Sequence, residues 1–205
     1  MTAAHGETSD EVLMVRYQRG DREAFAELLR RYERPVYNFA LRYLRHASWA
    51  EDVTQEAFLR LVQRAGEFKH ESRFSTWLYT ITRNLCVDHL RRQKHRRHAS
   101  LDGGSDDGEG RSTLGDRFAD PHPAASTERV VVASEIRERV ALAVEELPEE
   151  QKEVFLLRHI GDVPFQEIAV ITGVGENTVK SRMRYALERL QKALCEFEEY
   201  ARALR

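Results

Sequence analysis

One stretch without helical or strand periodicity divides this chain and limits what it can fold into. Residues 99–127 carry six acidic side chains against two arginines, a net charge of −4, together with five of the chain's 11 glycines and two prolines. Such a segment has too little apolar surface to offset the conformational entropy that it would lose on ordering. We therefore predict a flexible acidic linker over 99–127, with one folded domain over 9–98 and another over 128–199.

Apolar residues recur at helical spacing on both sides of this linker, as in the series Phe25, Leu28, Leu29, Tyr32 and Val36. No segment alternates apolar and polar residues in the way that a half-buried strand does. The predicted fold class is therefore all-α, with two small helical domains.

Capping residues set the expected start of the first two helices. Ser9 or Asp10 precedes a helix over 11–19, and Asp21 precedes a helix over 22–44.

Other residues mark the boundaries farther along the first domain. Pro35 is expected to kink or split its helix, because proline lacks a backbone donor. Ser48 and Glu51 form a capping-box pattern before the next helix, which Gly66 is expected to end. Residues 67–76 have the composition of a loop, and a long helix is expected to follow to about residue 97.

Composition excludes several classes of protein. The net charge of the 205 residues is only −2, so a nucleic-acid site requires local segregation of charge. Two cysteines far apart in sequence make neither a disulfide framework nor a zinc site, and no apolar run is long enough to cross a membrane. The N-terminal residues lack the pattern of a secretory signal. Without a Gly-rich phosphate loop, a metal-ligand cluster or a nucleophile elbow, the chain is expected to be no enzyme and to need no cofactor, metal or small-molecule substrate.

The second domain contains a helix-turn-helix pattern. A short helix is expected over 164–172, a turn with two glycines over 173–175, and a long helix from 176 onward. In this motif the second helix enters the major groove of DNA. Its polar side is either an ordinary solvated face or a DNA-reading face, and the complete spacing favours DNA. The candidate DNA contacts on it are Asn177, Thr178, Lys180, Ser181, Arg182, Arg184 and Tyr185.

The same helix carries residues with other expected roles. Its apolar side is predicted to face the core, and it includes Val179, Leu187 and Leu190. Glu176 puts a carboxylate at the helix start, where it would repel phosphate or interact with the positive end of the helix dipole.

The long helix that ends the first domain changes from apolar to basic along its length. Trp77, Leu78, Ile81 and Leu85 form its expected buried stripe, whereas residues 88–98 carry five basic side chains and one acid, a net charge of +4. Such a patch suits phosphate neutralisation. The loop before the helix offers aromatic, cationic and hydroxyl side chains, which suit stacking on unpaired bases and hydrogen bonding to them.

The aromatic residues of this loop allow two interpretations. Phe68, Phe74 and Trp77 either contact bases or close the core beneath the loop, and periodicity favours the core for Phe74 and Trp77. Cys86 lies near the buried stripe and is expected to be an inert core thiol.

Three segments of the chain carry a family resemblance. They are AEDVTQEAFLRLV (50–62), FKHESRFSTWLYTITRNLCVDHLRR (68–92) and LPEEQKEVFLLRHIGDVPFQEIAVITGVGENTVKSRM (147–183). They resemble, in the same order, the conserved regions of extracytoplasmic-function sigma factors, which are the two-domain members of the sigma-70 family. The acidic linker falls where this family has a variable connection.

The resemblance implies a non-catalytic subunit that directs core RNA polymerase to specific promoters and promotes strand opening at the −10 element. The second domain would read the −35 element through the helix-turn-helix face named above, and would also contact the flap of the second large subunit. Docking on the clamp helices of the largest subunit is implied for Asp52, Gln55, Glu56 and Leu59. Contacts with −10 DNA are implied for Lys69, Ser72, Arg73, Phe74, Thr76, Thr80, Arg83, Asn84, Arg91 and Arg92.

The family also implies regulation and a place in the cell. An anti-sigma factor is expected to hold the protein inactive. The protein is expected in the cytoplasm, associated with the nucleoid or tethered to the membrane through that inhibitor.

Two other functions compete with this one. A sigma-like decoy would bind the inhibitor but no promoter, and would lack the basic and aromatic DNA contacts that this sequence keeps. An operator-binding regulator would need only the second domain and would leave the loop over 67–76 unexplained.

Overall fold

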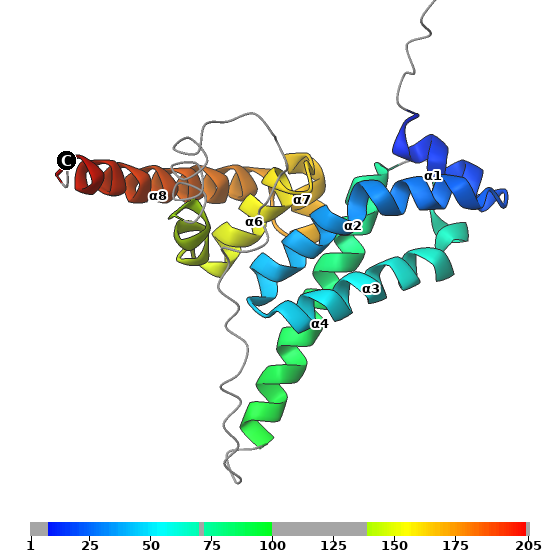
Figure 1. The fold of residues 1–205 in the computed structure, drawn as a ribbon, viewed down its shortest axis with the longest axis horizontal. Coiled ribbons are helices and arrows are strands. Elements are labelled where there is room, and N and C mark those ends of the chain that lie inside the picture. Colours follow the sequence, from blue (N-terminus) through cyan, green and yellow to red (C-terminus); the bar gives the residue numbers. More distant parts are fainter. Residues whose placement is uncertain (1–7, 70–71, 100–138, 204–205) are drawn as a thin grey trace, which may run out of the picture. The chain divides into compact units, whose positions relative to one another are not determined.

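The computed structural model describes residues 8–69, 72–99 and 139–203, and every regular element within these ranges is a helix (Figure 1). The all-α fold class is therefore confirmed. Residues 100–127 of the predicted linker lie outside the described residues, as does the first part of the helix expected before residue 148.

The first two helices begin at the capping residues that the sequence indicates. Helix α1 spans Asp10–Gln18, and the Ser9 side chain accepts a hydrogen bond from the Val12 backbone N–H at 3.4 Å. Helix α2 spans Arg22–Leu44, and Asp21 Oδ1 accepts hydrogen bonds from the amides of Glu23 and Ala24 at 3.0 and 3.2 Å. The Ser9 hydroxyl and the Asp21 carboxylate thus accept hydrogen bonds from backbone amides at the helix start, which have no carbonyl partner within the helix.

Of the two outcomes predicted for Pro35, a kink or a split, the split is wrong, because helix α2 continues through this residue as one helix. Proline removes one backbone hydrogen bond. The residues that follow it, Val36 and Phe39, are completely buried, and the free energy of their burial offsets that loss.

Helix α3 spans Ala47–Gln63 and begins earlier than predicted. The capping-box prediction is wrong, because Ser48 lies inside the first turn and its hydroxyl lies 3.1 Å from His46 Nδ1. The residue at the cap position is His46, whose side chain makes no capping hydrogen bond. The helix ends before Gly66, which belongs to a short 3-10 helix, η1, over Ala65–Glu67.

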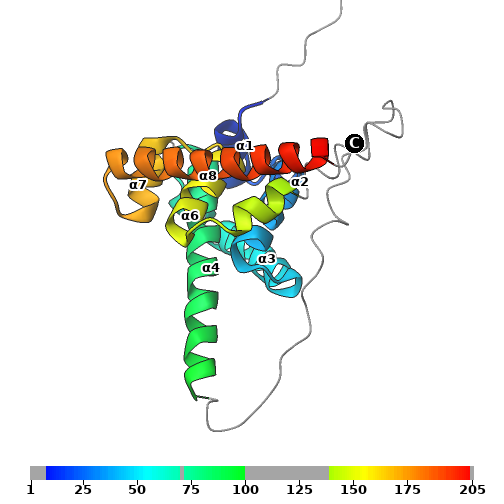
Figure 2. The same ribbon diagram turned by 90° about the vertical axis from the view of Figure 1, so that its left-hand side faces the viewer.

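Helix α4, Phe74–Ala99, is the long helix expected at the end of the first domain. Helix α2 packs against α1, α3 and α4, and α3 also packs against α4. The core between them includes Leu28, Phe39, Leu61 and Leu78, all completely buried. The C-terminal turns of α4 run on beyond α2 and α3, which leaves the basic end without helical neighbours from α1–α3 (Figures 1 and 2).

The helix-turn-helix pattern is confirmed toward the C-terminus. Residues 139–145 are helical and are followed by α6 over Glu149–His159, α7 over Phe165–Thr172 and α8 over Glu176–Ala203. Gly173 has a φ of +72°, and its amide donates to the Ala169 carbonyl, so a glycine is needed where α7 ends.

The apolar side of α8 differs from the prediction at one residue. Val179, Ala186 and Leu190 are buried, whereas Leu187 is 48% exposed. The inward stripe follows Ala186 to Leu190, and Leu187 lies about 100° farther around the helix.

The two cysteines differ in environment, which predicts different reactivity. Cys86 is completely buried and its burial raises the pKa of the thiol, whereas Cys195 is exposed. Because the thiolate is the reactive form, iodoacetamide at pH 8 should alkylate Cys195 in the native protein and leave Cys86 unmodified. Mass spectrometry of the native and the urea-unfolded protein measures this. Fast native labelling of Cys86 would mean that its helix opens readily.

Candidate nucleic-acid interface

The loop before α4 and one face of α4 bring together most of the residues predicted to contact −10 DNA. Lys69, Ser72 and Arg73 are exposed in the loop, and Asn84 is exposed on the helix. Thr76, Thr80 and Asn84 follow each other at four-residue spacing, which places them on one side of the helix. The Thr80 hydroxyl donates to the Thr76 carbonyl at 2.7 Å, so its oxygen still has an acceptor site.

Two of these residues do not present their functional groups to solvent. The Thr76 hydroxyl is buried and has no hydrogen-bond partner among the described residues. The ring of Phe74 is 0% exposed. It packs edge-on against Tyr32, with centroids 5.1 Å apart, and lies 6.2 Å from Phe68 and 6.5 Å from Trp77. The core interpretation of this residue is the one that fits the structure. Phe74 supports the loop from below and does not present its ring to solvent.

The remaining candidates extend the same surface toward the basic end of α4. Arg83 is half-buried, and its guanidinium lies 3.4 Å from the Asn84 side-chain oxygen. Arg91 and Arg92 are exposed, and Arg92 Nε donates to the Asp88 carbonyl at 3.3 Å. This surface combines amide and hydroxyl groups near the loop with cations farther along the helix, which suits base contacts at one end and phosphate contacts at the other.

A second polar surface lies on the N-terminal turns of α8. Asn177, Thr178, Ser181 and Tyr185 are all exposed. The Arg184 guanidinium lies 4.9 Å from the centre of the Tyr185 ring, a cation–π contact that holds both side chains on the outer face.

Each cation predicted on this surface has a carboxylate partner. Lys180 Nζ lies 2.7 Å from Glu176, Arg182 lies 2.5 Å from Glu150, and Arg184 lies 3.7 Å from Glu188. The acid at the start of α8 therefore both meets the positive end of the helix and neutralises a neighbouring lysine. The Arg182 side chain is only 18% exposed, so it is the least accessible of the three cations. Exposed pairs such as the other two contribute about 0.2–1 kcal/mol, which phosphate can replace.

The third predicted surface lies on α3. Asp52 and Gln55 are exposed, Leu59 is 51% exposed, and Glu56 forms an ion pair with Arg60 at 2.8 Å. The buried centre of a protein interface is more apolar than its rim, and Leu59 offers an apolar side chain of that kind among polar neighbours.

Comparisons with known proteins identify the family of the chain. The chain matches the family model of sigma-70 region 2 over residues 28–96 and that of sigma-70 region 4 over residues 137–190. The RNA polymerase sigma-H factor of Pseudomonas aeruginosa is 33% identical over 188 residues, which cover 90% of this chain and 93% of the relative. The ECF RNA polymerase sigma factor SigW of Bacillus subtilis is 32% identical over 177 residues, with coverage of 86% and 92%. The chain is an extracytoplasmic-function sigma factor of the sigma-70 family. It directs RNA polymerase to promoters, as members of this family do.

Solved structures share the fold of this sigma factor. RpoE of Bartonella quintana, in a co-crystal structure with NepR, gives a TM-score of 0.64 at 21% identity, covering 83% of this chain and 96% of RpoE. CnrH, in complex with the cytosolic domain of CnrY, gives a TM-score of 0.60 at 21% identity, covering 92% and 99%. No described helix is both long enough and apolar enough to cross a membrane.

Two residues of this sigma factor's surfaces escaped the sequence-based prediction. Val62, 40% exposed, lies three residues after Leu59 and extends the apolar part of the α3 surface. The three-residue spacing from Leu59 is the sequence signal that could have predicted Val62 as part of this surface. Glu150 pairs with Arg182 from 32 residues away and gives no local signal in the sequence.

Proposed function

We propose that this sigma factor holds promoter DNA at two points, with the loop and α4 on the −10 element and the N-terminal turns of α8 on the −35 element. The observation that carries the proposal is the pair of exposed surfaces just described, each of which mixes base-reading side chains with cations. Either surface alone would suit ordinary DNA binding. Their combination suits a protein that contacts duplex DNA and an opened strand at once.

The −10 surface would contribute to strand opening through differential affinity. Asn84, Thr80 and the loop side chains Lys69, Ser72 and Arg73 would contact bases that become available only when the strands separate. Part of the binding free energy is then gained only in the open state, which shifts the equilibrium toward that state. Arg91 and Arg92 would hold phosphates beside it.

The α3 surface would dock on the clamp helices of the largest polymerase subunit. Leu59 and Val62 offer the apolar anchor, and Asp52, Gln55 and Glu56 offer partners for cations and amides. The helix-turn-helix domain would contact the flap of the second large subunit. The polymerase forms the phosphodiester bonds, and the sigma factor has no catalytic part in it.

An anti-sigma factor would regulate this protein. Two similar solved structures are complexes: RpoE of Bartonella quintana with the anti-sigma factor NepR, and CnrH with the cytosolic domain of CnrY. An inhibitor that covers the polymerase-binding surfaces would keep the free protein inactive in the cytoplasm, or at the membrane if the inhibitor is anchored there.

Run-off transcription with purified core polymerase on a promoter library tests the function. Promoter-specific transcripts should appear only when the wild-type protein is added. The double variant Leu59→Ala/Val62→Ala should abolish them, whereas Glu33→Ala, which changes an exposed residue of α2, should not. Absence of any specific transcript with the wild-type protein would reject promoter recognition and favour the decoy.

The variant Asn84→Ala tests the −10 surface. It should lower the preference for the best −10 sequence over its variants roughly threefold to tenfold, because one hydrogen bond to a base contributes about 0.5–1.5 kcal/mol. Competitive run-off on templates that differ at single −10 positions measures the preference. An equal loss on every template would place Asn84 in general DNA binding.

The variant Arg184→Ala tests the −35 surface. It should weaken binding of the best −35 duplex by about 1–3 kcal/mol if the guanidinium reads a guanine. The matched control is Arg189→Ala, which removes the same charge from an exposed position of α8. Fluorescence anisotropy at fixed salt measures both. If the two variants weakened binding equally, Arg184 would contribute only its charge to DNA binding and would not read a base.

A further inference from the structure

Helix α1 holds the backbone on one side of the loop that carries Lys69, Ser72 and Arg73. Gln18, the last residue of α1, donates from Nε2 to the Ala65 carbonyl at 2.8 Å and to the Phe68 carbonyl at 3.0 Å. These carbonyls lie 47 and 50 residues farther along the chain. One amide group therefore fixes both ends of the short turn that leads into Lys69.

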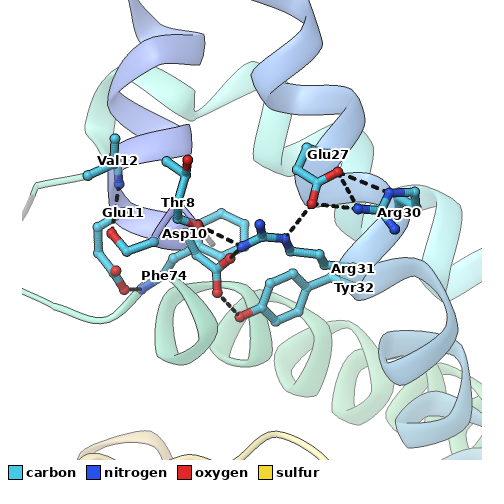
Figure 3. Close-up of polar contacts among 10 residues, drawn as sticks. Thr8, Asp10, Glu11, Val12, Glu27, Arg30, Arg31, Tyr32 and Phe74 are labelled. Carbon is cyan, nitrogen blue, oxygen red and sulfur yellow. Dashed lines mark hydrogen bonds and ion pairs between the residues drawn. The ribbon is translucent and has the colours of Figure 1, made fainter. Parts of the chain in front are cut away.

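The same helix holds the other side of the loop. Glu11 Oε1 accepts a hydrogen bond at 3.1 Å from the backbone N–H of Phe74, the first residue of α4 (Figure 3). The residue before this helix is Arg73, which is not a capping type. A carboxylate from α1 thus satisfies an amide that would otherwise lack a helical partner, and it also faces the positive end of the α4 dipole.

Helix α1 is itself fixed against the core. Leu13 and Met14 are buried, and Asp10 binds the Tyr32 hydroxyl and the Arg31 guanidinium of α2 (Figure 3). The hydrogen bonds of Gln18 and Glu11 therefore join the loop to a helix that packs against the core.

We propose that Glu11 and Gln18 are positioning residues for −10 recognition, an inference that rests on the proposed function of the loop. They touch no DNA. They fix the backbone before Lys69 and after Arg73, so that the loop side chains meet the opened strand with less ordering entropy to lose. Such an effect acts on the −10 preference and leaves −35 binding unchanged.

Four variants test this positioning. Gln18→Met removes both N–H donors and keeps the length of the side chain, and Glu11→Ala removes the acceptor. Glu11→Gln keeps an acceptor oxygen and should restore function. The matched control is Arg19→Ala, which changes the exposed neighbour of Gln18.

The readouts are made with the reconstituted holoenzyme. Competitive run-off on templates that differ in the −10 element should show roughly a threefold to tenfold loss of preference for Gln18→Met and Glu11→Ala. Affinity for a −35 duplex and the far-ultraviolet circular dichroism spectrum should match those of the wild type, which separates positioning from unfolding. Glu11→Gln and Arg19→Ala should keep the wild-type preference.

The possible failures are distinguishable. If the wild-type holoenzyme shows no −10 preference, the proposed function itself fails. If the wild type shows the preference and Asn84→Ala reduces it, but Gln18→Met and Glu11→Ala leave it unchanged, only the positioning role is overturned. A loss of −35 binding equal to the loss of −10 preference would also overturn it, because it would reveal a general structural role.

Discussion

Replacing Phe74 with alanine is expected to lower the free energy of unfolding of the α1–α4 domain by about 3–5 kcal/mol. The ring is completely buried and packs against Tyr32, Phe68 and Trp77, so its removal leaves a cavity beneath the loop. A small domain has only about 5–15 kcal/mol of stability, so the variant should be close to unfolding at physiological temperature. Urea denaturation followed by circular dichroism measures the change.

Two control variants separate the loss of core packing from other effects of changing the loop. Phe74→Leu keeps most of the apolar volume and should retain much more stability than Phe74→Ala. Ser72→Ala, on the exposed part of the loop, should change the stability by less than about 0.5 kcal/mol. If Phe74→Ala were as stable as the wild type and yet failed to open promoters, the ring would have to leave the core and contact DNA.

The second large effect is expected for Asp10, which joins α1 to α2. Its carboxylate accepts hydrogen bonds from the Tyr32 hydroxyl at 2.5 Å and from Arg31 at 2.8 Å (Figure 3). Asp10→Ala should lower the free energy of unfolding by about 1.5–3 kcal/mol, since it removes hydrogen bonds to a charged group and leaves a half-buried hydroxyl without this acceptor. Arg31 should be affected less than Tyr32 by the loss of the Asp10 carboxylate, because it also donates to Glu27 at 2.7 Å and to the Thr8 carbonyl at 2.8 Å.

A double-mutant cycle isolates the bond between Asp10 and Tyr32. The effects of Asp10→Ala and Tyr32→Phe should be less than additive by about 1 kcal/mol, because each variant already removes the shared contact. Strict additivity would show that the two side chains contribute independently.

The environment of Tyr32 predicts that the free energy of unfolding depends on pH in the alkaline range. Burial, and then the hydrogen bond to Asp10, raise the pKa of the phenol above that of an unfolded tyrosine, which is about 10. The unfolded chain therefore loses the proton first, and the stability contributed by Tyr32 is present below pH 10 and falls as the pH rises above it. Tyr32→Phe should flatten this loss in urea denaturation between pH 9 and 11.

Local patterns predicted the parts of the fold that local interactions determine. Ser9 and Asp21 cap helices because each bonds to amides two or three residues away. The pattern of Ser48 and Glu51 predicted the wrong boundary, since the same residue types are also compatible with the interior of a helix. The order and type of the helices could be predicted, but the exact start of α3 could not.

The candidate site shows the same limit. Exposed cations and amides on α4 and α8 could be predicted from periodicity, because one face of each helix is apolar. The ion pair between Glu150 and Arg182 and the hydrogen bonds of Gln18 could not, because no spacing rule relates residues 32 or 47 positions apart. Phe74 required the structure for a different reason: an aromatic residue beside cations is compatible with both base stacking and a core.

The cap that Glu11 provides for α4 has a consequence for synthesis on the ribosome. Glu11 precedes Phe74 by 63 residues, so it is made roughly 3 to 13 s earlier at typical bacterial and eukaryotic elongation rates. The acceptor for the first turn of α4 is therefore available before that helix emerges. A circular permutant in which α1 is translated last would retain the same contacts in its folded state. During translation, however, the start of α4 would lack its Glu11 acceptor until α1 had been made.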